Sequence, residues 1–175
     1  ESSEIKKVGQ NIKYDWLVLS QSGVELSGVV FDTMLASYLI NPSKRAHNLD
    51  QIALDFLDHK TTSFAEVFDK GMSSFAQVSL EKAVPYACED ADITLMAQSV
   101  LTRELEKIGL TELFQTVEMP LVPVLMRMEQ RGVAVDDDKL RDLSKSFEHR
   151  LEQLESDIHA LAGESFNINS PQQMG

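Results

Sequence analysis

The chain has 175 residues, of which 43% are hydrophobic, 25% are charged and 7% are aromatic. This composition is typical of a folded domain and excludes disordered, collagen-like and low-complexity chains. The formal net charge of −12 argues against a protein that holds nucleic acid through a broad basic face. It does not argue against an enzyme that reaches phosphate groups through cations held by carboxylates, because those ions supply the positive charge.

The cysteine count and the hydropathy narrow the class of protein further. Cys88 is the single cysteine, so an intrachain disulfide and a cysteine zinc cluster are both excluded. No apolar run approaches the roughly 20 residues that span a bilayer, and no segment resembles a signal peptide. The expected compartment is the cytoplasm, with no membrane partner.

The first residues predict a βαβ unit and hence an α/β fold. Ile5–Gly9 and Val24–Phe31 have the composition of buried strands, and Asn11–Ser22 between them carries apolar residues at helical spacing. A strand, a helix and a strand in this order indicate two parallel strands. Two strands make a poor core, so the rest of the sheet is expected to come from sequence upstream of Glu1.

Helices are predicted to follow. Asp32 is expected to cap a helix over Thr33–Ile40, which ends where Asn41 precedes a proline. Leu49–Leu57 has an amphipathic helical pattern, whereas residues 58–79 are expected to be irregular.

Two longer helices are predicted in the second half of the chain. The first spans about Glu81–Ile108, with Pro85 in its first turn and Cys88 in its apolar stripe as a core residue. The pattern changes near residues 112–116, where a domain boundary is expected, giving domains over 1–114 and 115–175. Asp136 is expected to cap a helix that uses a single narrow apolar stripe to contact one partner face. The stripe consists of Leu140, Leu143, Phe147, Leu151, Leu154, Ile158 and Leu161.

Acidic residues on two predicted helices are the candidates for chemistry. Tyr86 and Asp90 are four residues apart and share a helical face, and Asn11 and Asp15 share one in the same way. Carboxylates brought together from two helices are suitable ligands for Mg²⁺, which prefers oxygen donors. A tyrosine hydroxyl beside them could orient an attacking water.

Each of these residues also has a plain structural interpretation. An isolated aspartate on a helix is usually a solvated surface charge, and Glu89 and Asp92 are interpreted in that way. The four histidines do not cluster in the sequence, so each is expected to be structural or exposed. Phe64, which follows three hydroxyl residues, is either a plug in the core or a ring available for base stacking.

Several strings nevertheless resemble the 3′–5′ exonuclease domain of family A DNA polymerases of the bacterial DNA polymerase I type. These strings are Val8–Asp15, Phe31–Leu35 and Tyr86–Asp92. Strings further on resemble the start of the thumb in the polymerase domain of the same family. These are Glu118–Leu125, Arg131–Val133 and Phe166–Pro171. The resemblance covers nearly the whole chain, and exoribonucleases of the RNase D type share only its first set of motifs.

The resemblance implies an RNase H-like (DnaQ-like) fold in which four carboxylates bind two divalent cations, Mg²⁺ or Mn²⁺, that hydrolyse the terminal phosphodiester of a DNA 3′ end. By position, Asp15 and Asp90 are expected to ligate metal and Tyr86 to orient the nucleophilic water. Asn11 is expected to accompany Asp15, and Phe64 falls where the family has a phenylalanine packed against the terminal bases. The implied partners are single-stranded 3′ ends and primer-template DNA, together with the palm and fingers of a parent polymerase.

One family motif does not occur in this sequence. No Asp-x-Glu pair precedes Asp15, although that pair supplies two of the four carboxylates. The sequence is therefore expected to be a fragment that is nearly inactive alone. Two alternatives stay open: an inert exonuclease-like scaffold that supports an attached polymerase, and an exoribonuclease with a helical C-terminal domain.

Overall fold

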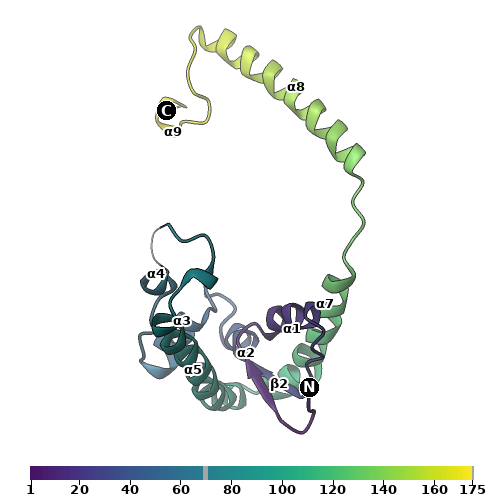
Figure 1. Cartoon of the computed structure of the whole chain (residues 1–175). Helices are drawn as coiled ribbons and strands as arrows, with labels where there is room; N and C mark the ends of the chain where they lie inside the picture. The colour runs from purple at the N-terminus through teal and green to yellow at the C-terminus, as the bar shows by residue number, and fades with distance from the viewer. Residues whose placement is uncertain (69–70, 175) are drawn as a thin grey trace. The chain divides into compact units, whose positions relative to one another are not determined.

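The computed structural model describes residues 1–68 and 71–174 (Figure 1). The described chain is largely helical and contains one small parallel sheet, which confirms the α/β class. Its internal contacts divide it into two units, Glu1–Gly132 and Val133–Gly175. The domain boundary expected near residues 112–116 stays a prediction.

The sheet consists of β1 (Lys7–Gly9) and β2 (Val29–Asp32), which pair in parallel as predicted. The crossover contains helix α1 (Ile12–Gln21). The second strand is shorter than the sequence predicted, because the chain turns at Gly28, where φ is +75°. The register places Gly9 opposite Asp32, so both strands end beside the start of α1.

The next two helices confirm their predicted bounds. Helix α2 (Thr33–Ile40) follows β2 directly, and the Asp32 carboxylate accepts hydrogen bonds from the first turn of this helix. Helix α3 (Leu49–Leu57) begins after Asn48, whose side chain accepts from the amide of Gln51 at 3.1 Å. Both helices thus begin at a side chain that satisfies amide groups without an intrahelical partner.

The stretch predicted to be irregular contains two short elements, α4 (Phe64–Val67) and the 3₁₀ turn η1 (Phe75–Gln77). A capping box between Ser63 and Glu66 starts α4, in which the Glu66 carboxylate accepts from both the amide and the hydroxyl of Ser63 at 2.7 Å. Residues 69 and 70, which belong to the same predicted stretch, lie outside the described residues.

Helix α5 (Leu80–Lys107) is the longest helix of the first unit, and it lies beside α2 and α3 (Figure 1). It begins at Leu80, so Pro85 lies inside it rather than in its first turn. The prediction that Cys88 is a core residue is wrong, because Cys88 is exposed. The buried face is instead the one that continues from Tyr86 and Asp90. Its buried members are Ile93, Thr94, Ala97, Leu101 and Leu105.

The core lies between α2, α3, α5 and β2. Ile52, Leu101 and Leu105 are almost fully buried, and the ring of Phe31 on β2 packs at 4.8 Å against that of Phe114. Burial of such side chains stabilises the fold by roughly 1.5–3 kcal/mol each. This core holds α5 against the end of the sheet from which α1 and α2 emerge.

The first unit ends in α6 (Thr111–Leu113), the π-helical turn η2 (Phe114–Glu118) and α7 (Met119–Arg131). Helix α7 packs against α1, and Lys13 forms an ion pair with Glu129 across this contact.

The second unit contains α8 (Asp137–Ala162) and α9 (Pro171–Met174). As predicted, the Asp136 side chain caps α8, accepting from the amide of Lys139 at 2.9 Å. None of the residues of α8, all of which the structure describes, is buried, so its apolar stripe is exposed. No helix in the described residues is both long and apolar enough to cross a membrane.

Candidate functional site

The structure brings Asp15 and Asp90 to one cleft. Asp15 lies in the first turn of α1, Asp90 lies on α5, and both line a cavity of about 410 Å³. The other lining residues are Val8, Gly9, Gln10, Leu49, Ala91 and Thr94. The cleft thus lies at the carboxyl end of β1, where a parallel sheet commonly presents its functional residues.

The sharp turn from β1 into α1 sets the position of Asp15. A Cβ atom on Gly9 would lie 2.9 Å from Cβ of Ile12, so a larger residue would force the strand and the first residue of the helix apart. Asn11 takes the left-handed conformation, with φ of 57°, which asparagine tolerates better than most residues. These two positions allow α1 to begin within three residues of the strand's end.

Asp32 fixes this arrangement from the neighbouring strand. One carboxylate oxygen accepts from the amide of Ile12 at 2.7 Å, while the other accepts from Met34 at 2.8 Å and Leu35 at 3.1 Å. One side chain therefore caps both α1 and α2. Burial raises the pKa of Asp32, which is only 1% exposed, and the amide hydrogen bonds oppose that rise.

The carboxylates of the cleft have raised pKa values. Partial burial raises the pKa of Asp15, and the nearby charge of Asp32 adds to the rise. Partial burial is also the main cause of the raised pKa of Asp90, with the charges of Asp50 and Glu89 acting in the same direction. Carboxylates that are costly to ionise in the bare protein are stabilised by a bound cation.

Tyr86 lies one turn before Asp90 on α5, and its hydroxyl donates a hydrogen bond to the Asp90 carboxylate. Burial, followed by the charge of Asp90, raises the pKa of Tyr86. The hydroxyl thus stays protonated at neutral pH. It can orient a water molecule by accepting from it, but it cannot act as a base.

Phe64 is 50% exposed, so the interpretation as a plug in the core is wrong. Its ring stacks on that of Phe68, with centroids 4.9 Å apart, and lies 6.0 Å from the ring of Phe75. Phe75 in turn lies 6.1 Å from the ring of Tyr86. A run of aromatic rings therefore leads from Phe64 to the tyrosine beside Asp90.

Asn11 is placed differently from the other candidates. It lines a small cavity of about 60 Å³ together with Asp32, Leu35 and Val122, and it does not line the cleft of the two aspartates. Its backbone conformation at the start of α1, rather than its side chain, is what the structure connects with Asp15.

Sequence reasoning missed Asp50 and Glu89. Glu89 is held by His59 and by the amide of Thr62, so it is not the free surface charge that was expected. Asp50 accepts from Thr61 at 2.6 Å, and its charge raises the pKa of both Tyr86 and Asp90. No local sequence signal marks either residue, because their partners lie on other elements.

The cleft offers the type of ligand that a hard divalent cation prefers, but too few of these ligands for two cations. Asp15 and Asp90 offer carboxylate oxygens, the ligands that Mg²⁺ and Mn²⁺ prefer. Within residues 1–68 and 71–174, no group of three or more potential ligand side chains gathers at one point. A two-cation site would therefore need ligands beyond this pair.

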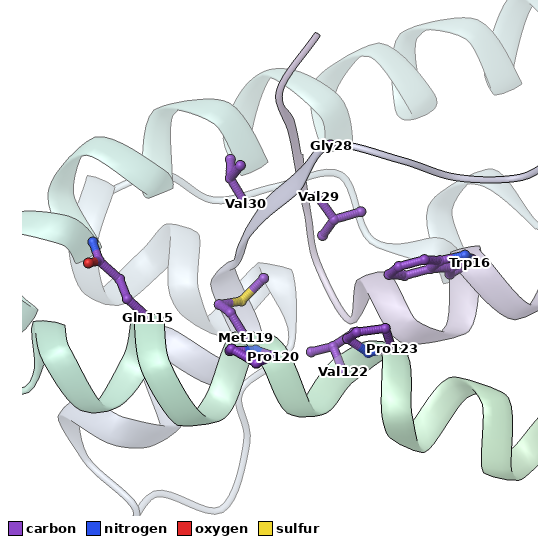
Figure 2. Close-up of a pocket in the computed structure, with 9 residues that line it drawn as sticks. All are labelled: Trp16, Gly28, Val29, Val30, Gln115, Met119, Pro120, Val122 and Pro123. Atoms are coloured by element: carbon purple, nitrogen blue, oxygen red, sulfur yellow. The ribbon is translucent and has the colours of Figure 1, made fainter. Parts of the chain in front are cut away.

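A second cavity, of about 490 Å³, lies between α1, β2 and the segment that leads into α7. Figure 2 shows Trp16, Val29 and Met119 among the side chains that line it. Its other lining residues are Gly28, Val30, Gln115, Pro120, Val122 and Pro123, and none of the nine is an acid, base or nucleophile. This cavity therefore offers no side chain suited to acid–base or nucleophilic chemistry.

Comparison with known proteins identifies the family of the chain. A family model described as 3′–5′ exonuclease matches residues 1–106. DNA polymerase I of Pseudomonas aeruginosa is 41% identical over 174 residues, which cover 97% of this chain and 19% of that protein. DNA polymerase I of Bacillus subtilis is 37% identical over 175 residues, which cover 100% of this chain and 20% of that protein.

A solved structure is similar as well. It is described as the POL domain of Pol1 from M. smegmatis in complex with DNA primer-template and dNTP. The similarity has a TM-score of 0.76 at 26% identity and covers 99% of this chain and 27% of that chain. The chain spans about a fifth of the length of the curated relatives.

Proposed function

Because the chain belongs to the 3′–5′ exonuclease family, as its motifs predicted, we propose that residues 1–114 form part of the proofreading nuclease of a DNA polymerase I. The nuclease removes the terminal nucleotide from a DNA 3′ end with the help of two divalent cations. Residues 115–175 begin the attached polymerase domain, whose palm and fingers are the partners of this segment.

The observation that carries the proposal is the meeting of Asp15 and Asp90 at one cleft, with the Tyr86 hydroxyl bonded to Asp90. These residues come from helices far apart in the chain. The parallel strands on either side of α1 in the chain, and the core that holds α5 against them, support an RNase H-like fold. The same cleft would be hard to explain in an inert scaffold, since it leaves two carboxylates with raised pKa values and no cation partner among the described residues.

The chain's own residues would act by binding and orientation. Asp15 and Asp90 supply oxygen ligands, and when bound the divalent cations supply charge stabilisation at the scissile phosphate. Tyr86 holds the Asp90 carboxylate through its donated hydrogen bond and accepts a hydrogen bond from the attacking water. Phe64 offers an exposed ring to the terminal bases. The further ligands come from an Asp-x-Glu pair elsewhere in the parent polymerase.

The proposal is tested by digestion of a 3′-labelled single-stranded DNA with Mn²⁺ by the full-length polymerase. We expect Asp15→Ala and Asp90→Ala each to lower nuclease activity by about a thousandfold, since a lost metal ligand removes several kcal/mol of transition-state stabilisation. Nucleotide incorporation should change by less than twofold, because it takes place on another domain. Asp92→Ala, an exposed carboxylate on the same helix, is the matched control.

The outcomes separate the alternatives. If the unmodified polymerase does not release the terminal nucleotide, the domain is a scaffold and the proposal fails. If it releases nucleotides from single-stranded RNA as fast as from DNA, the exoribonuclease interpretation is preferred. Equal loss of nuclease and polymerase activity in the Asp90→Ala variant would also contradict the proposal.

A further inference from the structure

Glu89 connects the helix of the candidate metal ligand with the loop that precedes Phe64. Its Oε1 lies 2.9 Å from Nε2 of His59, and its Oε2 accepts from the amide of Thr62 at 2.8 Å. Each carboxylate oxygen thus has its own partner, and the two partners lie three residues apart in one loop. Two such contacts fix the orientation of the loop and not only its distance from the helix.

A further hydrogen bond holds the same loop to α3. Thr61, which is 6% exposed, donates its hydroxyl hydrogen to Asp50 on α3 at 2.6 Å. The loop is therefore fixed at three residues, to α3 at Thr61 and to α5 at His59 and Thr62. The capping box of Ser63 follows at once and starts α4.

Phe64 is the first residue of α4, so its direction depends on the loop just described. Half of its side-chain surface is exposed, although the ring stacks on Phe68 and Phe75. An exposed ring with two stacking neighbours and a fixed backbone is pre-organised for contact with a base, since little freedom is lost on binding.

Glu89 and Asp90 are consecutive on a helix and point in directions about 100° apart. Asp90 lines the cleft, while Glu89 holds the loop. One turn of α5 therefore positions both the candidate metal ligand Asp90 and, through the loop, the ring of Phe64. The pKa of Glu89 is lowered to about 2, chiefly by the hydrogen bond from His59, so the carboxylate is ionised throughout the neutral range.

We propose that Glu89 is a positioning residue for the DNA substrate, which acts through His59 and Thr62 by holding Phe64 where it stacks on the terminal base. This inference rests on the proposed nuclease function and assigns part of its substrate binding. Glu89 does not touch the reacting atoms. Its loss should thus weaken substrate binding and leave the chemical step nearly unchanged.

The test measures KM and kcat of the full-length polymerase for 3′ hydrolysis of a short single-stranded DNA with Mn²⁺. We expect Glu89→Ala and Phe64→Ala each to raise KM about tenfold, because the stacking on one base is lost. We expect kcat to stay within twofold. Asp92→Ala on the same helix, where the carboxylate is exposed, should leave both constants unchanged.

A double variant decides whether Glu89 acts through Phe64. In the Phe64→Ala background, Glu89→Ala should raise KM by less than twofold further, because the ring that it positions is already absent. If the effects of the two substitutions on KM multiply, the inference is overturned. A fall in kcat at unchanged KM would also overturn it, because Glu89 would then act on Asp90. Absence of 3′ hydrolysis in the unmodified polymerase would instead reject the proposed function itself.

Discussion

Asp32 holds the starts of two helices beside the candidate site, and its replacement gives the most specific prediction for stability. Its carboxylate accepts from Ile12, Met34 and Leu35 and thereby caps α1 and α2 at once, in a position that is 1% exposed. Asp32→Ala leaves these amides without their acceptor, and the amide of Ile12 is buried from water. The variant therefore tests whether one side chain holds the start of both helices.

The expected cost follows from the hydrogen bonds. Each lost cap costs about 1–2 kcal/mol. The buried amide of Ile12, left without a partner, adds about 1–3 kcal/mol, which overlaps in part with the loss of the cap of α1. Removal of a carboxylate that is itself costly to bury offsets some of this. The net loss for Asp32→Ala is expected to be about 3 kcal/mol.

Unfolding in urea followed by tryptophan fluorescence measures this loss. Trp16 is the single tryptophan and lies on α1, so its emission reports on the unit that contains Asp32. With a denaturant slope of about 1.5 kcal/mol/M, the midpoint should fall by about 2 M. Asn48→Ala removes an ordinary exposed cap from α3 and should cost only about 1 kcal/mol.

Asp32→Asn should fall between these two variants. Its amide oxygen can accept at one helix, but its NH₂ group faces donors at the other. The double-cap account would be refuted if Asp32→Ala cost no more than Asn48→Ala, or if Asp32→Asn were as stable as the unmodified chain.

Three further predictions concern the cleft and the turn before β2. The raised pKa of Asp15 means that its ionised form destabilises the fold, so Asp15→Asn should raise the thermal midpoint in EDTA at pH 7, and the gain should vanish below the ordinary pKa of 3.8. A gain that grows on acidification would contradict this sign. Gly28→Ala should cost at least about 2 kcal/mol more than Gly23→Ala, because both have φ near +75° but only Gly28 has a carbonyl oxygen, that of Ile5, 2.5 Å from the added Cβ. Equal costs in urea unfolding would argue against this contact. Calorimetric titration of residues 1–175 with Mn²⁺ should show only weak binding that is lost in Asp90→Asn, whereas tight binding at two sites would contradict the incomplete ligand set.

Local signals in the sequence were enough to predict α2 and α3 at their exact bounds. Asp32 and Asn48 are strong capping residues directly before an apolar helical pattern, and the step from Asn41 to a proline ends α2. Capping and periodicity act over a few residues, so no tertiary information was needed.

The buried face of α5 was predicted less well. Cys88 counts as apolar in a periodicity argument but is exposed, whereas Leu101 and Leu105, which belong to the same predicted apolar pattern, are buried. Packing against α2 and α3 determines which of two neighbouring apolar faces of this long helix is buried. The short helix at Phe64 was missed because it has only four residues, too few for a helical period to show, although its capping box is a local signal.

At the candidate site, the sequence located Asp15, Tyr86 and Asp90 through motifs, and the structure brings the two aspartates to one cleft. The sequence did not reveal the residues that support these three. The second cap made by Asp32 depends on strand register, and the contacts of Glu89 depend on how a loop folds back on α5. Such long-range hydrogen bonds have no periodic signature.

The lack of buried residues along α8 has a consequence for hydrogen exchange and for spectroscopy. A helix without a buried side chain opens at about the free energy of an isolated helix, which is close to zero in water. The amide protons of α8 should therefore exchange with solvent far faster than those around Leu101 in α5. Far-UV circular dichroism, to which α8 contributes 26 residues, should then change before the fluorescence of Trp16 does. Unfolding curves from the two probes will not coincide, because circular dichroism reports on both units whereas the fluorescence of Trp16 reports on the unit that holds the aspartates.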